Sequence, residues 1–280
     1  MNKLPLIKPL IKTNEFDDCF ITSITDNSKD VLENSLFVAR QGEGSHGKEF
    51  IKEAIKNGAS CIISDQELEE ETDIPIHYIN NLEDRVTEIL FQFHELAADD
   101  FIFHGVTGTN GKTTTAFMAH NIMRELQKPS IYIGTLGAII NDDHMQTKGN
   151  TTPGIFELFE ILKACKNKQK TYVFIEISSH ALAQKRLCNL TFFQTIILNI
   201  QSDHLDYHKT ETNYIDAKLS ITNLNNLNPT IISIDQIQDL LPRLSVAQGE
   251  QLLKSNFISA MDPSAPFKYS FVYNPEGSSK

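Results

Sequence analysis

The sequence contains no Cys-x-x-Cys pair and no apolar run long enough to cross a bilayer. Its N-terminal stretch, MNKLPLIKPLIK, is interrupted by prolines and lysines and lacks the apolar core of a signal peptide. Its four cysteines are far apart in the chain: Cys19, Cys61, Cys165 and Cys188. Such spacing favours free thiols in a reducing compartment over disulfides or a zinc site. We therefore expect a cytoplasmic protein without membrane insertion.

Positive charge is also scarce, since 25 Lys and Arg face 36 Asp and Glu and the formal net charge is −11. This balance argues against nonspecific binding to nucleic acid or to an anionic membrane, although a local cradle can still hold a phosphate ligand. A chain of 280 residues is long enough for two domains, and its 40% hydrophobic content is ordinary for a globular protein.

The first hundred residues predict a small α/β domain. Residues 36–39 (LFVA) and 59–64 (ASCIIS) are apolar enough for buried strands. Between them lies a predicted helix that contains Phe50, Ala54 and Ile55 and ends at Gly58. The apolar spacing within 81–97 predicts a second helix. Two aspartates at 99 and 100 then indicate a boundary, so we expect domains at 1–98 and 99–280.

The second part alternates strands and helices, which predicts a parallel sheet with ligands at the carboxyl ends of its strands. The predicted strands are 101–107 (FIFHGVT), 171–177 (TYVFIEI) and 192–200 (FFQTIILNI), and 228–235 (NPTIISID) is a candidate for a further one. The predicted helices are one after Lys112, with Ala119, Ile122, Met123 and Leu126 on one face, and one from Thr152, with Ile155, Leu158, Phe159 and Leu162. The tail after about residue 222 has no clear pattern.

Chemically distinctive residues follow three of these strands. The first strand runs into TGTNGKT, in which Gly108 and Gly111 let the backbone amides turn inward and Lys112 supplies a positive charge. The second ends at Glu176, and the third is followed by Asp203 and His204. A phosphate cradle, a carboxylate and an imidazole are the groups that a magnesium-assisted phosphoryl transfer needs.

Two alternative interpretations, a zinc site and a GTPase, have less support in the sequence. His204 and His208 are four residues apart, a spacing that suits zinc on a helix, but no third His or Cys ligand is nearby. A GTPase would carry an Asn-Lys-x-Asp motif, and the nearest string, NKQK at 167–170, lacks the aspartate.

Four blocks of the sequence together resemble the ATP-dependent Mur ligases, in particular the UDP-N-acetylmuramoyl-tripeptide synthetases. They are TGTNGKTTT (107–115), NTTP (150–153), EISSHALAQKR (176–186) and, within 199–218, NIQSDHLDYH with YIDAK. Val106 stands where many phosphate-binding loops have their first glycine, and the resemblance explains it as a family trait. The resemblance covers roughly residues 20–222.

The N-terminal part is similar to the family's domain for the uridine diphosphate end of the substrate. Ser28 is retained there, but Asn27 and Lys29 replace the family's Asp and Arg, and His46 replaces the Asp of an Asp-Gly pair. The resemblance thus implies a small uridine-binding α/β domain (1–98) followed by a P-loop-type parallel-sheet central domain (99–280) that is incomplete.

The resemblance also implies roles for individual residues, with ATP and Mg²⁺ as cofactors. The nucleotide loop would be Gly108, Thr109, Asn110, Gly111, Lys112, Thr113 and Thr114; the metal ligands Thr113, Glu176 and His204; the catalytic residues Lys112, Glu176, His204 and Lys218. Contacts to the UDP-muramoyl-peptide would come from Ser28, Thr151, Thr152, Ser178, Gln184 and Arg186.

Lys218 aligns with a lysine that these ligases carbamylate with CO₂. Carbamylation requires a neutral amine, so we predict that the surroundings lower the pKa of Lys218. The less favoured alternative, weighed without the resemblance, is an exposed lysine of a helix.

The implied reaction adds a third amino acid to UDP-MurNAc-L-Ala-D-Glu through an acyl phosphate. After Lys218, however, we find no adenine-binding arginine segment, no third domain and no Asp-Asn-Pro-Arg motif. The chain is therefore expected to be a fragment or a short form with little or no synthesis of its own. The alternative is an inactive relative that binds the UDP-muramoyl-peptide or ATP as a sensor or partner.

Overall fold

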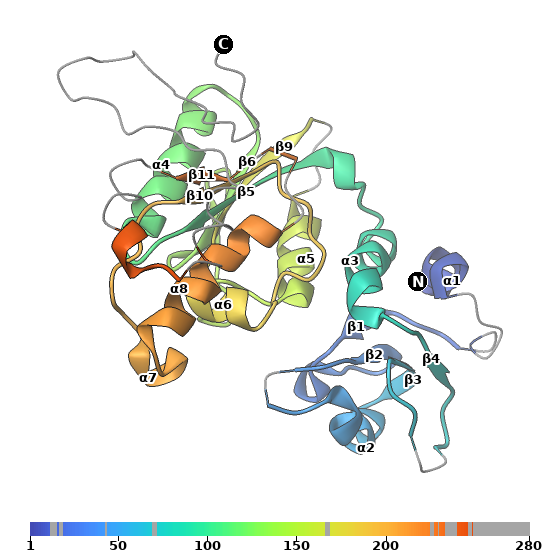
Figure 1. Ribbon diagram of the computed structural model, residues 1–280. Coiled ribbons are helices and arrows are strands. Elements are labelled where there is room, and N and C mark those ends of the chain that lie inside the picture. The colour runs from blue at the N-terminus through green and yellow to red at the C-terminus, as the bar shows by residue number, and fades with distance from the viewer. Residues whose placement is uncertain are drawn as a thin grey trace. The chain divides into compact units, whose positions relative to one another are not determined.

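The computed structural model describes residues 1–11, 16, 19–42, 44–68, 72–165, 169–224, 227–228, 230–232, 240–245 and 248 (Figure 1). They form two compact units. Unit 1 comprises residues 1–98 together with Ile155–Ala164, and unit 2 comprises Asp99–Gly154 and the described chain from Cys165 onward. Within the described residues, no helix combines the length and the hydropathy that spanning a bilayer requires.

Unit 1 is built on a four-stranded parallel sheet with the order β1-β2-β3-β4. Its strands are β1 (Ser23–Thr25), β2 (Ser35–Ala39), β3 (Ala59–Ser64) and β4 (Ile76–Tyr78). Its helices are α1 (Leu4–Ile11), α2 (Ile51–Lys56), α3 (Leu82–Phe93) and α5 (Ile155–Ala164). The small α/β fold predicted for this part of the chain is confirmed.

The core of unit 1 forms where α2 covers β2 and β3. Phe37, Ile51 and Ile62 belong to one cluster of buried side chains there, because their apolar spacing places them on the covered faces. The chain leaves α2 through Gly58, whose φ of +111° favours glycine. The predicted strands at 36–39 and 59–64 are confirmed, and so is a helix between them. Phe50, however, lies in the 3₁₀ turn before this helix and is exposed, contrary to the prediction.

Helices α3 and α5 pack on each other through aromatic rings. Phe91 and Phe159 meet edge to face with ring centroids 4.7 Å apart. Helix α3 ends at Phe93, earlier than predicted, because the chain turns through Glu95 at a φ of +55°. All four apolar residues predicted for the buried face of α5 are buried: Ile155, Leu158, Phe159 and Leu162.

Unit 2 contains a seven-stranded sheet with the order β11-β10-β5-β9-β6-β7-β8. Figure 1 labels β5, β6, β9, β10 and β11 of this sheet. The strands are β5 (Phe101–Thr107), β6 (Ser130–Gly134), β7 (Gly137–Ile140), β8 (Asp143–Met145), β9 (Thr171–Glu176), β10 (Gln194–Ile197) and β11 (Ile231–Ile232). The first five in this order pair in parallel, as predicted, whereas β7 and β8 are antiparallel.

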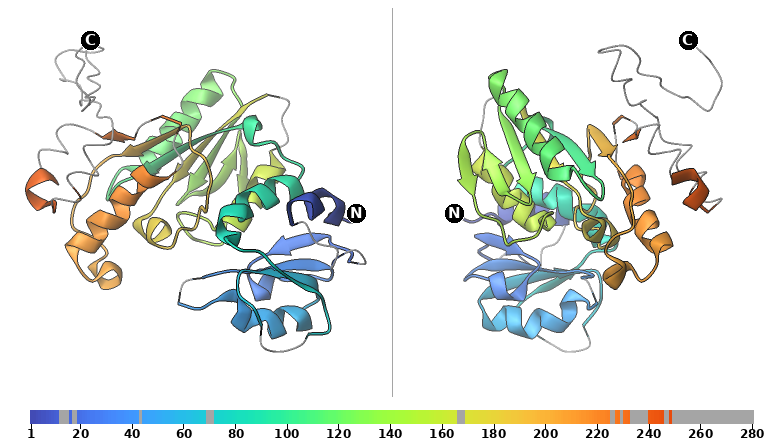
Figure 2. Two further views of the ribbon diagram at one scale, coloured as in Figure 1. Left: turned by 45° about the vertical axis from the view of Figure 1, so that its right-hand side comes forward. Right: turned by 90° about the vertical axis from the view of Figure 1, so that its left-hand side faces the viewer.

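The helices of unit 2 lie on both faces of this sheet. They are α4 (Lys112–Glu125), α6 (Ser179–Ala183), α7 (Leu205–His208) and α8 (Glu211–Leu219). Helix α4 covers one face, while α6 and α8 pack together on the other (Figure 2). Strand β11 lies within the candidate strand 228–235, and residues 229 and 233–235 of that candidate lie outside the described residues.

Candidate active site

The carboxyl ends of β10, β5 and β9 meet at one edge of the sheet, because the three strands are neighbours and run in parallel. This confirms that the three segments predicted to carry the chemistry come together. The phosphate-type loop at 108–111 follows β5, Glu176 ends β9, and Asn199 follows β10.

The loop at 108–111 is held in shape by the chain that follows β10. The backbone N–H of Asn110 donates to Oδ1 of Asn199 at 2.9 Å, and Nδ2 of Asn199 donates to the carbonyl of Asn110 at 3.0 Å. Gly111 has a φ of +85° and is the N-cap of α4, so the loop ends at a helix N-terminus. Such a terminus presents backbone N–H groups to an anion. The loop is therefore preorganised for a phosphate ligand.

Lys112 folds back over this loop. Its Nζ donates to the carbonyls of Gly108 at 2.8 Å and Thr109 at 3.0 Å. Burial lowers the pKa of Lys112, while the carboxylates of Glu176 and Asp203 act in the opposite direction. The amine thus lies beside the loop and near two acidic groups.

Glu176 is fully buried and accepts hydrogen bonds on both carboxylate oxygens. Thr113 donates to Oε2 at 2.9 Å and the hydroxyl of Thr135 to the same oxygen at 3.2 Å. The N–H of Thr135 donates to Oε1 at 3.0 Å, and the hydroxyl of Tyr132 donates to Oε1 as well. These donors replace the water that burial removes, so both oxygens of the buried carboxylate are satisfied.

The pair formed by Thr113 and Glu176 fits Mg²⁺. Mg²⁺ prefers hard oxygen ligands and is usually held by one or two protein groups together with phosphate oxygens and water. Within the described chain, no three His, Cys, Asp or Glu side chains form a metal-binding cluster. The structure thus joins two of the three predicted metal ligands through their side chains.

His204, the third predicted ligand, lies next to His180 and Asp203. Its backbone is left-handed, with a φ of +49°, at the start of α7. Its ring lies 5.1 Å from that of His180 and its Nε2 is 3.5 Å from Oδ2 of Asp203. His208, the partner in the zinc alternative, is instead hydrogen-bonded to Ser179 at 3.0 Å. The role of His204 as a metal ligand stays a prediction.

Lys218 lies on α8 and is only 1% exposed, so its interpretation as an exposed helix lysine is wrong. Burial, with a further contribution from the charge of Lys112, lowers its pKa to about 7, while Asp203 acts in the opposite direction. The predicted lowering of this pKa is confirmed. Its Nζ lies 4.8 Å above the ring of Tyr214, whose hydroxyl is 2.9 Å from Oγ1 of Thr109. Tyr214 therefore lies between the lysine and the nucleotide loop.

Most of the predicted contacts to the muramoyl-peptide form a connected polar network beside β9. Oγ1 of Thr152 donates to the carbonyl of Glu176 at 2.8 Å and accepts from the N–H of Ser178 at 2.9 Å. Arg186 donates to the carbonyl of Thr152 at 3.1 Å and to Oε1 of Gln184 at 2.6 Å. Their contacts to a substrate stay predictions.

Of the two remaining candidates, Thr151 is connected to this region through Thr135, whereas Ser28 is not. Thr151 lies within 3.5 Å of the hydroxyl of Thr135. Ser28 belongs to unit 1, where it is buried and donates to Oε2 of Glu53.

Several side chains of the site were not predicted from the sequence. Tyr132 lies within β6, a strand that was not predicted, and Thr135 follows that strand directly. Tyr214 was not distinguished from other residues of its helix. Gly134 also belongs here, because a Cβ at this position would lie 2.1 Å from Oε1 of Glu176. The available signal was the apolar stretch SIYIG, which follows Pro129 and is itself followed by Thr135.

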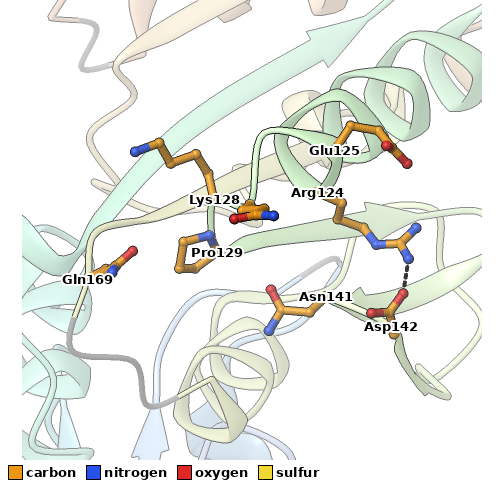
Figure 3. A pocket seen from close by; sticks show the side chains of 8 residues that line it. Arg124, Glu125, Lys128, Pro129, Asn141, Asp142 and Gln169 are labelled. Atoms are coloured by element: carbon orange, nitrogen blue, oxygen red, sulfur yellow. Dashed lines mark ion pairs between the residues drawn. The ribbon is translucent and has the colours of Figure 1, made fainter.

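A surface hollow of about 500 Å³ lies elsewhere in unit 2 (Figure 3). It is lined by residues of the C-terminal end of α4 and of the segments next to it, including Lys128 and Asn141. Arg124 forms an ion pair with Asp142 at its border. Because the phosphate-type loop precedes the opposite end of α4, this hollow is separate from the candidate active site.

Comparisons with known proteins agree with this geometry. Residues 106–255 match the Mur ligase middle domain, and residues 20–92 match the Mur ligase family catalytic domain. A UDP-N-acetylmuramoyl-L-alanyl-D-glutamate–2,6-diaminopimelate ligase of Fusobacterium nucleatum is 34% identical over 75% of this chain and 43% of the relative. UDP-N-acetylmuramyl-tripeptide synthetase 2 of Oceanobacillus iheyensis is 32% identical over 72% of this chain and 41% of the relative. The chain thus spans less than half the length of these relatives.

Solved structures give the same fold. A UDP-N-acetylmuramoyl-L-alanyl-D-glutamate–2,6-diaminopimelate ligase superposes with a TM-score of 0.65 at 24% identity, covering 85% of this chain and 48% of that one. A MurF ligase of Thermotoga maritima in complex with ADP gives 0.51 at 24% identity, covering 81% and 49%. With the middle-domain match spanning more than half of its length, the chain belongs to the Mur ligase family.

Proposed function

We propose that this chain carries the nucleotide and UDP-peptide sites of an ATP-dependent amide ligase that acts in peptidoglycan precursor synthesis. The observation that carries the proposal is the Thr113–Glu176 pair beside Lys112 and its preorganised loop. In the proposed reaction, the γ-phosphate of ATP passes to the terminal D-glutamate carboxylate of UDP-MurNAc-L-Ala-D-Glu. The amine of a third amino acid then attacks the acyl phosphate and releases phosphate.

Different residues of unit 2 are proposed to carry out different parts of this reaction. The amides of the loop and the amine of Lys112 hold and neutralise the phosphates, and positioning with charge neutralisation is the main contribution to phosphoryl transfer. Thr113 and Glu176 would hold Mg²⁺, which supplies further neutralisation of the transferring phosphate. His204 is proposed as a further ligand. Thr151 and the network of Thr152, Ser178, Gln184 and Arg186 are proposed to orient the UDP-peptide.

Lys218 is proposed to react with CO₂ as its neutral amine. The nitrogen lone pair attacks the carbon and one proton leaves the nitrogen, so the neutral amine becomes a carbamate anion whose oxygens can ligate or orient a magnesium centre. A pKa of about 7 makes the neutral amine available near neutral pH.

Unit 1 is proposed to hold the uridine diphosphate end of the substrate. The hydroxyl of Ser28 already donates to Glu53, so it would meet the uridine as an acceptor. His46 accepts from the N–H of Lys48 at 3.0 Å, and its Nε2 lies 2.6 Å from Oδ1 of Asp65. Both ring nitrogens of this histidine are thus engaged within unit 1.

Calorimetry of ADP binding in the presence and absence of Mg²⁺ tests the proposal, with Lys112→Ala as the variant. We expect Mg²⁺-dependent binding by the wild type and at least a tenfold loss in Lys112→Ala, because the variant removes a charge-assisted contact. Lys128→Ala, at the other end of α4, is the control and should bind like the wild type.

Phosphate release with ATP, UDP-MurNAc-L-Ala-D-Glu and candidate amino acids extends this test. Release that depends on both the UDP-peptide and the amino acid supports a ligase. Saturable binding of either ligand without release supports the alternative of a non-catalytic binding protein. Absence of nucleotide binding by the wild type contradicts the ligase, and absence of binding of both ligands contradicts the alternative as well.

A further inference from the structure

Tyr132 on β6 directs its hydroxyl at the carboxylate of Glu176. The residue is fully buried, and its hydroxyl donates to Oε1 of Glu176 while accepting from the N–H of Leu136 at 3.3 Å. Its ring packs edge to face on Phe117 of α4 with centroids 5.7 Å apart. A phenylalanine would fill the same space and make the same ring contact. The hydroxyl is therefore needed for its hydrogen bonds and not for packing.

The two oxygens of Glu176 have different partners. Oε1 accepts from the hydroxyl of Tyr132 and from the backbone N–H of Thr135, and a backbone N–H cannot rotate away. Oε2 accepts only from side-chain hydroxyls in the described structure, those of Thr113 and Thr135. A hydroxyl can rotate and offer its lone pairs to a cation instead. Oε2 can thus be transferred to a metal ion without breaking a fixed contact, whereas Oε1 cannot.

The backbone of β6 reinforces this arrangement. A Cβ on Gly134 would lie 2.1 Å from Oε1 of Glu176 and 2.6 Å from the hydroxyl of Tyr132. These separations are far below van der Waals contact, so any side chain here would displace the carboxylate. The close approach of the strand and the hydroxyl of Tyr132 together fix one side of Glu176.

We propose that Tyr132 is a positioning residue that fixes Oε1 of Glu176 and so directs Oε2, next to Thr113, toward the metal–nucleotide site. This inference rests on the proposed binding of a magnesium nucleotide. Groups that orient a metal ligand by hydrogen bonding typically contribute 10- to 100-fold to metal affinity.

The test measures ADP binding by calorimetry at a series of Mg²⁺ concentrations with the full chain. In Tyr132→Phe we expect half-maximal binding to require at least tenfold more Mg²⁺. Tyr172→Phe removes a hydroxyl from the neighbouring strand β9 at its amino-terminal end and should leave the requirement unchanged. Thr135→Val removes one hydroxyl from Oε2 but keeps the N–H that binds Oε1, and should change the requirement by less than about threefold.

The outcomes distinguish a failure of this inference from a failure of the proposed function. If the wild type binds ADP with Mg²⁺ and Tyr132→Phe has the same requirement as Tyr172→Phe, the inference is wrong while the proposed function stands. A large effect of Thr135→Val without one of Tyr132→Phe also overturns it, because Oε1 would then face the metal. If the wild type shows no Mg²⁺-dependent binding, the proposed function fails and the inference with it.

Thermal melting establishes whether Tyr132→Phe is folded. If it is not, Gly134→Ala provides a second route, since its methyl group displaces both Oε1 of Glu176 and the hydroxyl of Tyr132. A wild-type Mg²⁺ requirement in folded Gly134→Ala contradicts the inference.

Discussion

At the scale of a single residue, the amine of Lys218 should make the free energy of unfolding depend on pH. Its pKa is lowered from 10.5 to about 7 in the folded protein, so between these values the unfolded chain binds more protons than the native state. The free energy of unfolding therefore rises with pH across this window, by up to about 1.4 kcal/mol for each pH unit from this group. In Lys218→Met this contribution is absent. We expect the variant to be more stable than the wild type at pH 6, with a difference that shrinks as pH rises.

Urea unfolding from pH 6 to pH 9 in carbonate-free buffer measures this effect. Lys163→Met removes an exposed lysine of α5 and should keep the wild-type slope. Adding ¹³C-bicarbonate near pH 8 should give a carbamate carbon signal by NMR in the wild type and none in Lys218→Met. Equal slopes for Lys218→Met and the wild type would show that the amine titrates normally.

At the scale of elements, helix α4 shows why a correct helix can be predicted with a buried face that is only partly right. Of the four residues of the predicted face, Ala119 and Met123 pack against the buried cluster, but Ile122 and Leu126 are 54% and 61% exposed. The buried positions are Ala116 and His120. His120 is buried because its ring nitrogens are satisfied by Oγ of Ser130 at 2.9 Å and the carbonyl of Asn141 at 3.2 Å. Hydrophobic periodicity counts histidine as polar, so it cannot detect a face that this residue helps to form.

Two substitutions in α4 test which face is buried. Ile122→Gln should change the free energy of unfolding by no more than about 0.5 kcal/mol, because the side chain is exposed. Ala116→Leu should lower it by about 1–3 kcal/mol, because a larger side chain does not fit a packed position. Urea denaturation of both variants measures the difference, and the reverse order would support the face predicted from the sequence.

The same physical reasons decide how much of the site could be predicted. Strands β5 and β9 are continuous apolar runs, so their ends, and with them Lys112 and Glu176, were placed correctly. Strands β7 and β8 are short, and β8 is largely exposed, so their pairing depends on neighbouring strands more than on their own composition. Tyr132 could not be assigned to the site because it points at Glu176 only once β6 lies next to β9.

At the scale of the whole molecule, neither unit is formed by one continuous stretch of the sequence. Helix α5 belongs to unit 1, although the residues on both sides of it belong to unit 2. Its Phe159 is fully buried, packs on Phe91 and stacks on His94 at a centroid distance of 6.0 Å. A fragment of residues 1–98 would lack these contacts, so a cut at the domain boundary predicted from the sequence would remove part of the core of unit 1.

The substitution Phe159→Ala tests this assignment. Truncating a buried phenylalanine lowers the free energy of unfolding by about 3–5 kcal/mol, and we expect the loss to fall on unit 1. Hydrogen exchange should show faster exchange of the amides of β2 and β3, with little change in β5 and β9. Phe192→Ala, a fully buried phenylalanine of unit 2, should give the opposite pattern. If Phe159→Ala instead deprotects β5 and β9 more than β2 and β3, then α5 contributes mainly to the stability of unit 2.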